Sequence, residues 1–216
     1  MGDDGDKNKL KITGKTVEGP VSKHINRRIS RLITLAILES GIQVSPNTIS
    51  WSSLILTGIA CIVIIKGSLV IGGILVQLAS IIDGVDGELA RARGMASKRG
   101  AFLDTMLDRY ADIIIYTGII LYLVNNTTIN TYIILVFILA LSGDLLVSYL
   151  HSKGTELANI HPSIIGPLDS IASRDVRLFV IAITLLLTIP LVGLILVSIL
   201  SHIYVVVKSY YLYKIL

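Results

Sequence analysis

Paired aspartates inside apolar sequence are the residues of this chain best suited to chemistry. Seven of its fifteen acidic residues fall within or at the ends of apolar segments, where a carboxylate needs a partner or a purpose. Such residues are functional candidates by default. The seven are Asp83, Asp86, Glu88, Asp104, Asp108, Asp112 and Asp144.

Helical spacing brings four of these carboxylates together. At about 100° per residue, Asp83 and Asp86 lie on one side of a first helix, and Asp104 and Asp108 line one face of a second. The short polar link between the two segments makes them antiparallel neighbours, so the two rows can face each other. Four like charges would repel strongly, or hold protons, unless cations compensated them. Oxygen ligands with no His or Cys nearby favour Mg²⁺ or Mn²⁺, with Ca²⁺ as competitor, over zinc.

Small and polar residues beside the carboxylates suit a phosphate ligand. Gly87, Ala90 and Gly100 let a ligand or a neighbouring helix approach the backbone. Arg91 and Ser97 can contact phosphate oxygens. Two metals with an arginine favour displacement at phosphorus, because metals stabilise the attacking and leaving oxygens. The alternative is a proton or cation pathway that uses the same carboxylates.

The elements that position these residues are expected to be membrane helices. Of 216 residues, 53% are hydrophobic and 16% charged, and the mean hydropathy is +0.76, which leaves too few charges for the surface of a soluble domain. A helical span takes about 20 residues. We therefore expect a six-span catalytic domain over residues 46–216. Its spans are predicted at 48–66, 69–90, 101–124, 131–151, 176–189 and 191–211, with a loop over 152–175 and a tight turn at Pro190.

Two regions precede the spans. Residues 19–45 alternate basic and apolar residues at helical spacing, which predicts an amphipathic interfacial helix near anionic headgroups. Residues 1–18 are polar, so we expect a cytosolic tail and no cleavable signal peptide. Connections rich and poor in Lys and Arg alternate, which puts both termini and the aspartates on the cytosolic side of the plasma membrane. The predicted fold class is an all-α integral membrane protein.

Cations on the cytosolic side are candidates for binding an acceptor that carries its own phosphate. Lys153, Arg174 and Arg177 are the first of these, although topological positive charge explains them about as well. Residues of the amphipathic segment could reach the same cavity mouth, although such residues more often contact headgroups. They are His24, Arg27 and Arg28.

The remaining polar residues of the spans carry weaker expectations. Asp112 could pair with Arg109 or with a neighbouring helix, and Asp144 could hydrogen-bond an acceptor hydroxyl. The histidines of the later segments show no metal-ligand spacing and are interpreted as structural. They are His151, His161 and His202.

One motif covers the two carboxylate rows. From Asp83 to Asp108 the sequence reads D-x-x-D-G-x-x-A-R-x8-G-x3-D-x3-D. It resembles the signature of the CDP-alcohol phosphotransferases, with every fixed residue and both gap lengths in agreement. The six-span layout and the interfacial helix are similar too, so the resemblance covers most of the chain. It implies an enzyme that transfers a phospho-alcohol group from a CDP-alcohol to an acceptor hydroxyl and releases CMP.

The resemblance also implies roles for single residues. Asp83, Asp86 and Asp104 resemble the ligands of one metal ion, and Asp83, Asp104 and Asp108 those of a second, so two Mg²⁺ or Mn²⁺ ions are expected per active site. Asp108 resembles the family's general base, which takes the acceptor hydroxyl's proton as that oxygen attacks the β-phosphorus. The CDP contacts are expected at Pro46, Asn47, Thr48, Ile49, Asp86, Gly87, Ala90, Arg91, Ser97 and Gly100.

The substrates follow less directly from the resemblance. GPVSKHINRRISR and QLASIIDGVDGELAR are most similar to the archaeal di-myo-inositol-phosphate-phosphate synthase branch, in which CDP-inositol donates to inositol phosphate. That branch is often fused to a soluble cytidylyltransferase domain, for which we expect no room in these 216 residues. The partner activity then lies on a separate protein, or the chain is a phospholipid synthase using CDP-diacylglycerol or CDP-archaeol with inositol phosphate or another polar alcohol.

The partners expected from the resemblance are a second copy of the chain, as a homodimer, and membrane lipids. Nucleic acid is not an expected partner. A cation transporter built on the same intramembrane carboxylates is the alternative from another functional class.

Overall fold

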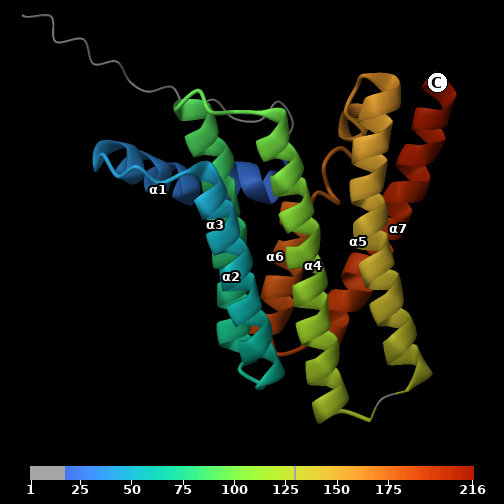
Figure 1. Cartoon of the computed structure of the whole chain (residues 1–216). Coiled ribbons are helices and arrows are strands. Elements are labelled where there is room, and N and C mark those ends of the chain that lie inside the picture. The colour runs from blue at the N-terminus through green and yellow to red at the C-terminus, as the bar shows by residue number, and fades with distance from the viewer. Residues whose placement is uncertain (1–17, 129) are drawn as a thin grey trace, which may run out of the picture.

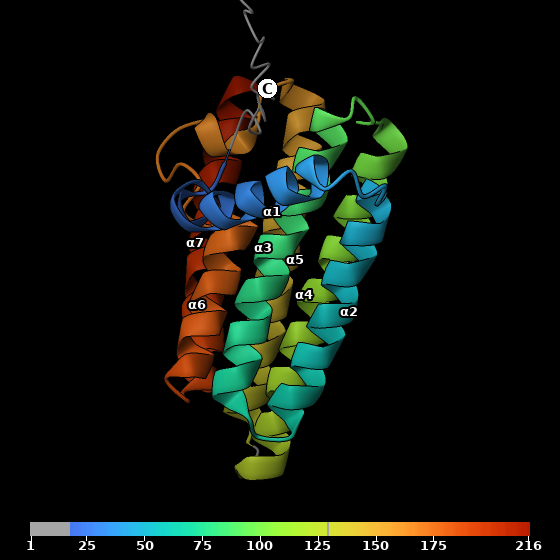
Figure 2. The same ribbon diagram turned by 90° about the vertical axis from the view of Figure 1, so that its left-hand side faces the viewer.

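The computed structural model describes residues 18–128 and 130–216 of the chain. These residues form helices and no strand. Long helices run side by side as a bundle, and a shorter one lies across it near one end (Figure 1, Figure 2). The elements are the π-helical turn η1 (Ser22–Asn26), α1 (Arg27–Glu39), α2 (Pro46–Ile65), α3 (Leu69–Ala92), α4 (Lys98–Asn126), α5 (Thr131–Ala158), the 3₁₀ turn η2 (Pro162–Ile164), α6 (Arg174–Leu186) and α7 (Pro190–Ile215).

Capping residues fix where several of these helices begin. The side chain of Ser45 accepts a hydrogen bond from the backbone N–H of Thr48, at the start of α2. Ser97 caps α4 in the same way, accepting from the N–H of Gly100 at 3.1 Å. Pro190 lies in the first turn of α7, where its missing N–H costs nothing, and this confirms the predicted turn between the last two helices.

The apolar core lies between the long helices, and α3 contributes Leu69 and Val76 to it. α3 packs against α1, α2 and α6. Its contact with α6 needs Gly73, because a Cβ at this position would lie 2.7 Å from the carbonyl oxygen of Ala182. Val76 of α3, Ile119 of α4 and Leu194 of α7 are fully buried in this core. The helix that carries two of the candidate aspartates is therefore held on three sides.

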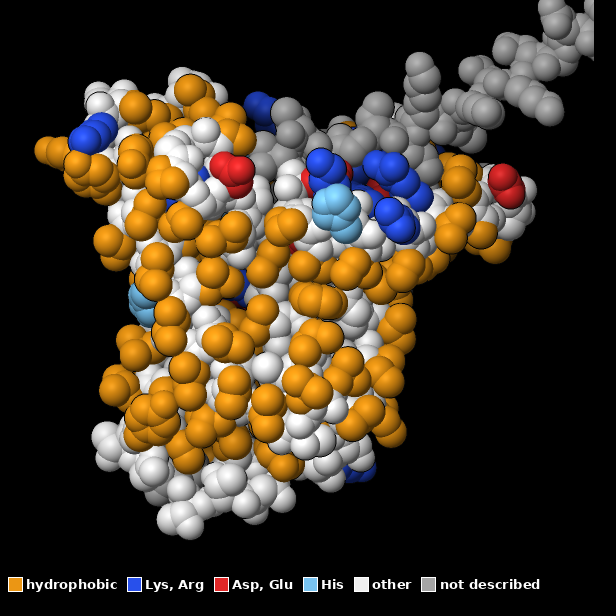
Figure 3. Space-filling view, turned by 180° about the vertical axis from the view of Figure 1, so that it is seen from behind, with side chains coloured by type: hydrophobic (Ala, Val, Ile, Leu, Met, Phe, Trp, Pro, Cys, Tyr) orange, Lys and Arg blue, Asp and Glu red, His pale blue; other side chains and the backbone are white. Residues whose placement is uncertain are grey.

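The outer surface of the bundle is apolar, as expected for a surface in contact with lipid. α2, α3, α5 and α7 are long and apolar enough to cross a membrane. Large apolar side chains such as Ile55, Ile134 and Val206 are exposed on the outside of the bundle. On the face seen in Figure 3, hydrophobic side chains cover the long sides, while most of the charged side chains gather toward the end that α1 crosses. The expected class, a helical membrane protein, is confirmed.

Two boundaries differ from the sequence expectation. The loop predicted over residues 152–175 is shorter, because α5 continues to Ala158 and ends at Asn159 in the left-handed conformation, with φ 55°. Polar residues such as Ser152, Lys153 and Glu156 end the apolar run without ending the helix. The amphipathic helix predicted over residues 19–45 stops at Glu39, and Gly41, with φ 71°, follows in the linker to α2. The predicted tail, residues 1–18, lies outside the described residues except for Glu18.

Candidate active site

Three carboxylates converge near the end of the bundle that α1 crosses. One oxygen from each of Asp83, Asp104 and Asp108 lies within 4.8 Å of the other two. Asp83 comes from α3, and the other two come from successive turns of α4. Their side chains are neither buried nor open, with 25% of Asp83 and 20% of Asp108 exposed. Three hard oxygen donors at this spacing fit Mg²⁺ or Mn²⁺.

Asp86 has a different environment from the other three aspartates. It lies outside the group whose oxygens approach one another. Its carboxylate is buried and accepts a hydrogen bond from the hydroxyl of Ser50 on α2. The four expected ligands are therefore arranged as a group of three with a fourth carboxylate at its side.

A first cavity of about 640 Å³ lies between α2, α3 and α4. The first turns of α2 and α4 both line it, and helix N-termini offer free N–H groups and partial positive charge to an anion. Its lining includes eight of the ten expected nucleotide contacts together with Asp104. These eight are Pro46, Asn47, Asp86, Gly87, Ala90, Arg91, Ser97 and Gly100.

The other two expected nucleotide contacts do not line the first cavity. Thr48 is held in the cap of α2, where its hydroxyl lies 2.8 Å from that of Ser45, and Ile49 follows it in the helix. Gly87, by contrast, matters to the cavity wall, because a Cβ there would lie 3.2 Å from the guanidinium of Arg91. Glycine thus leaves room for the arginine to lie along α3.

A second, smaller cavity of about 200 Å³ lies on the α1 side of the carboxylates. It is bounded by η1, α1, α3, the start of α6 and the connection before α6. Asp83 and Asp108 line it, whereas Asp104 lines the first cavity. The three carboxylates therefore stand between two cavities. The other polar residues that line the second cavity include Ser22, Arg27, Ser30, Ser80, His151, His161, Ser170, Ser173 and Arg174.

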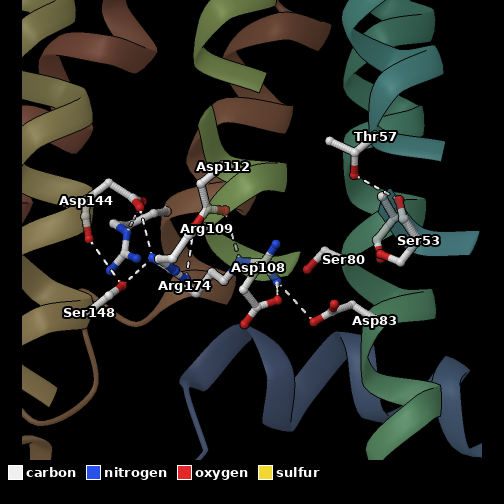
Figure 4. A network of polar contacts seen from close by, with 12 residues as sticks. Ser53, Thr57, Ser80, Asp83, Asp108, Arg109, Asp112, Asp144, Ser148 and Arg174 are labelled. Atoms are coloured by element: carbon white, nitrogen blue, oxygen red, sulfur yellow. Dashed lines mark hydrogen bonds and ion pairs between the residues drawn. The ribbon is translucent and has the colours of Figure 1, made fainter. Parts of the chain in front are cut away.

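Arg174 is the one of the three expected acceptor-binding cations that reaches the carboxylates. Its guanidinium lies 3.0 Å from Asp83, 2.7 Å from Asp108 and 2.9 Å from Asp112 (Figure 4). The contacts with Asp83 and Asp112 are charge-assisted hydrogen bonds, and the contact with Asp108 is an ion pair.

The other two expected cations lie elsewhere. Lys153 is exposed on α5, where it pairs with Glu156 at 2.9 Å, and it lines neither cavity. Arg177 is 1% exposed and donates to Asp144 at 2.5 Å. A shared position on the side expected to be cytosolic does not distinguish these environments, since helix rotation decides which way each side chain points.

Acidic and basic side chains alternate behind Arg174, in the interior of the bundle. Arg109 lies 3.0 Å from Asp112, which confirms the expected pairing, and 3.2 Å from Asp144 (Figure 4). Asp144 also accepts from Arg177 and, at 3.3 Å, from the hydroxyl of Tyr116. Asp144 lines neither cavity, and protein donors surround its buried carboxylate, so the expectation that it binds an acceptor hydroxyl stays a prediction that this geometry does not support.

A buried clamp between α1 and α3 was not predicted from the sequence. Glu88 of α3 is 1% exposed and accepts hydrogen bonds from three α1 side chains: Arg27 at 2.7 Å, Ser30 at 2.8 Å and Thr34 at 2.8 Å. Arg27, Ser30 and Thr34 stand three and four residues apart, so they share one helix face. That polar face inside an amphipathic segment was the signal. We call these four residues the α1–α3 clamp.

Two histidines of the second cavity also lacked a sequence signal. His151 of α5 and His161 of the following connection have ring centroids 4.5 Å apart. His151 also hydrogen-bonds the Tyr204 hydroxyl at 2.9 Å. Burial lowers the pKa of His161 below its usual value, and the positive charge of Lys208 lowers it further. The fold of the connection, not residue spacing, brings the two rings together.

Comparison with known proteins connects this geometry to a family. Residues 43–209 match the family model described as CDP-alcohol phosphatidyltransferase. The "Bifunctional IPC transferase and DIPP synthase" of Rubrobacter xylanophilus is 42% identical over 173 residues, which are 80% of this chain and 38% of that protein. The "Archaetidylinositol phosphate synthase" of Pyrococcus horikoshii is 31% identical over 171 residues, 79% of this chain and 85% of that protein. The chain thus spans less than half of the first relative and most of the second.

Solved structures share the fold. The phosphatidylinositol phosphate synthase of Mycobacterium tuberculosis with CDP-DAG bound superimposes with a TM-score of 0.70 and 19% sequence identity, covering 86% of this chain and 94% of that one. The same protein in complex with manganese and citrate gives a TM-score of 0.70 and 18% identity, covering 85% of this chain and 88% of that one. At such identity the likeness shows a common fold.

Proposed function

The chain belongs to the CDP-alcohol phosphatidyltransferase family, and we propose that it transfers a phospho-alcohol group from a CDP-alcohol to an acceptor hydroxyl with release of CMP. One observation carries the proposal: the close group of Asp83, Asp104 and Asp108 stands between two cavities. A transferase needs such an arrangement, because donor and acceptor must meet at the reacting phosphorus. The alternative, a cation transporter, does not explain the family match over residues 43–209.

The donor nucleotide is assigned to the first cavity. Its volume of about 640 Å³ is in the range of small-molecule sites. The N-termini of α2 and α4 and the guanidinium of Arg91 supply the positive charge that a pyrophosphate needs. The proposed contacts are the eight residues of its lining named above, with Thr48 and Ile49 flanking them in the first turn of α2.

The metal site is assigned to the aspartates. We propose two divalent cations, Mg²⁺ or Mn²⁺, held by Asp83, Asp86 and Asp104 on one side and by Asp83, Asp104 and Asp108 on the other. The all-oxygen donor set of the close group supports this choice. When bound, the cations stabilise negative charge on the attacking and leaving oxygens of a displacement at phosphorus.

Asp108 is the proposed general base. It lines the second cavity and also belongs to the close carboxylate group. Its carboxylate can take the proton of the acceptor hydroxyl as that oxygen forms a bond to the β-phosphorus, while the bond from this phosphorus to the CMP oxygen breaks. The proton ends on Asp108 and the electron pair on CMP.

The acceptor is assigned to the second cavity and is proposed to be a phosphorylated polyol. Two guanidinium groups, from Arg27 and Arg174, suit a phosphate, and the serine hydroxyls and the His151–His161 pair suit several hydroxyls. Inositol phosphate has both features. With CDP-inositol as donor the product is a phosphorylated di-inositol phosphate, which agrees with the name of the Rubrobacter relative.

A CDP-lipid donor is the second candidate. The Pyrococcus relative, of which the chain covers 85%, is named as an archaetidylinositol phosphate synthase. CDP-archaeol or CDP-diacylglycerol would extend its chains from the first cavity into lipid beside the bundle. This candidate uses the same residues and the same acceptor.

The membrane arrangement is proposed as six spans, α2 to α7, with α1 in the interface. α4, with 29 residues, reaches about 43 Å at 1.5 Å per residue, enough to cross the hydrocarbon. The plasma membrane is the proposed location, with both termini and the site on the cytosolic side, and the Lys and Arg side chains gathered beside α1 in Figure 3 support that orientation. The proposed regions are the tail 1–18, the interfacial segment 19–45 and the catalytic domain 46–216, and a homodimer is the proposed assembly.

CMP release by purified protein in detergent with Mg²⁺ tests the function. The donors are CDP-inositol and a CDP-lipid, each offered with inositol phosphate, and EDTA is the control. CMP from the first pair alone assigns soluble di-inositol phosphate synthesis, and CMP from the second alone assigns phospholipid synthesis. Metal flux in sealed vesicles without CMP release from either pair contradicts the proposal.

A further inference from the structure

Arg174 binds two of the carboxylates that are proposed to bind metal. Its Nη1 atom lies 3.0 Å from Oδ2 of Asp83 and 2.7 Å from Oδ1 of Asp108 (Figure 4). Both aspartates belong to the close group that can hold a cation. A guanidinium and a divalent cation therefore compete for the same carboxylates.

Arg174 also contacts Asp112, which is not one of the proposed metal ligands. The Nε atom of Arg174 lies 2.9 Å from Oδ1 of Asp112, one turn further along α4. Asp112 is fully buried, is outside the close group, and is held at 3.0 Å by Arg109. The arginine can therefore leave Asp83 and Asp108 through Nη1 and remain attached through Nε.

Charge balance favours that exchange. The close group carries three negative charges when ionised, and Arg174 supplies one positive charge. The four proposed ligands, Asp86 included, carry four negative charges, and two divalent cations neutralise all four. No excess negative charge then holds a guanidinium among them. An arginine that remains beside Asp112 can instead face the second cavity, which it already lines.

We propose that Arg174 is an internal counter-ion that divalent metal displaces from Asp83 and Asp108, and that Asp112 holds the released guanidinium toward the acceptor phosphate. Asp112 is thus a positioning residue. The inference rests on the proposed function. It makes the binding of metal and of a phosphorylated acceptor cooperative, because metal frees the cation that the phosphate needs, and the coupling is reciprocal.

Mn²⁺ affinity without nucleotide is the first test, measured from the electron paramagnetic resonance signal of free Mn²⁺. Arg174→Gln removes the competing cation, so we expect binding roughly tenfold tighter than in the unmodified protein. Lys66→Gln is the matched control, because it removes one positive charge at the opposite end of the bundle, and it should leave the affinity unchanged. Unchanged or weaker Mn²⁺ binding by Arg174→Gln overturns the inference.

Arg174→Lys covers the case in which the glutamine variant does not fold. Lysine keeps the charge but lacks the planar fork that reaches Asp112 and the metal carboxylates together. We expect Mn²⁺ binding between that of the unmodified protein and that of Arg174→Gln. An affinity equal to that of the unmodified protein counts against displacement.

Calorimetry with inositol phosphate tests the second half of the proposal. Mn²⁺ should raise the affinity of the unmodified protein for inositol phosphate roughly tenfold, and this gain should shrink to less than about threefold in Arg174→Gln and in Asp112→Asn. Equal gains in all three proteins contradict the positioning role. A complete lack of Mn²⁺ binding by the unmodified protein would instead contradict the metal site of the proposed function, so the two failures are distinguishable.

Discussion

Two carboxylates of the same helix, five residues apart, have opposite surroundings. Glu88 is 1% exposed, and three side chains of α1 donate to it. Asp83 is 25% exposed, belongs to a group of three carboxylates and receives the Arg174 guanidinium, which it shares with Asp108 and Asp112. Where protein donors surround a carboxylate, it fixes one helix to another. Where carboxylates outnumber the protein's cations, the balance favours a metal ion.

The two regions depend on each other through the second cavity. Arg27 and Ser30 of the α1–α3 clamp also line that cavity, together with Asp83. The clamp holds α1 across α3, and so holds one wall of the proposed acceptor site. Substitutions at Glu88 and at Asp83 should nevertheless have different effects. Replacing Glu88 should lower stability, and replacing Asp83 should weaken metal binding.

The largest effect on turnover is expected from Asp108→Asn, in the close group of carboxylates. The amide keeps the size of the side chain but cannot take the acceptor's proton, so turnover should fall roughly 10²–10⁴-fold. CDP binding, measured by calorimetry, should remain largely intact, because Asp108 lines only the second of the two cavities. A near-normal rate would remove Asp108 from the chemistry.

Substitutions in the α1–α3 clamp should lower the stability of the protein. Glu88→Ala leaves the buried guanidinium of Arg27 without its main partner, and breaking a buried pair in this way costs about 3–5 kcal/mol in the free energy of unfolding. Chemical denaturation in detergent measures it, with Glu156→Ala, an exposed carboxylate on α5, as the control. Loss of Mn²⁺ binding with unchanged stability would instead assign Glu88 to the metal site.

Asp83→Asn should give the reverse pattern. It removes one oxygen ligand from the close group, so Mn²⁺ affinity should fall at least roughly tenfold. The free energy of unfolding should change by less than about 1 kcal/mol, because the substitution also relieves repulsion from Asp108. Unchanged Mn²⁺ affinity, measured as for Arg174→Gln, would refute the assignment of Asp83 as a ligand.

The smallest effect is expected from Lys153→Gln. Lys153 is exposed, pairs with Glu156 and lines neither cavity. Surface pairs contribute little, so the melting temperature and the apparent KM for inositol phosphate should not change measurably. A severalfold rise in that KM would return Lys153 to the acceptor site that its sequence position suggested.

Helical periodicity predicted the contacts that depend on the spacing of residues within one helix. The spacing of Asp104 and Asp108 on one helix and the antiparallel link to the helix of Asp83 were enough to expect that these carboxylates face each other. The positions of Gly87 and Gly100 at the first cavity followed from the same motif. Local geometry determines these contacts, and local geometry can be read from the order of residues.

Contacts that depend on helix rotation or on loop folding were not predictable in the same way. Arg174 and Arg177 are three residues apart, yet one reaches Asp83 and the other Asp144. The meeting of His151 and His161 depends on the connection between α5 and α6. The α1–α3 clamp could have been predicted in part, because Arg27, Ser30 and Thr34 share one polar face of the amphipathic segment.

Metal-dependent CMP release tests the central claim most directly. Protein freed of metal with EDTA is mixed with inositol phosphate and with CDP-inositol or a CDP-lipid, and CMP is measured as Mn²⁺ is added back. We predict that release rises from background with Mn²⁺ in the unmodified protein and stays at least roughly 10²-fold lower in Asp108→Asn at every Mn²⁺ concentration. Equal release with and without Mn²⁺, or equal release by the two proteins, would contradict a transfer reaction that depends on the aspartates of α3 and α4.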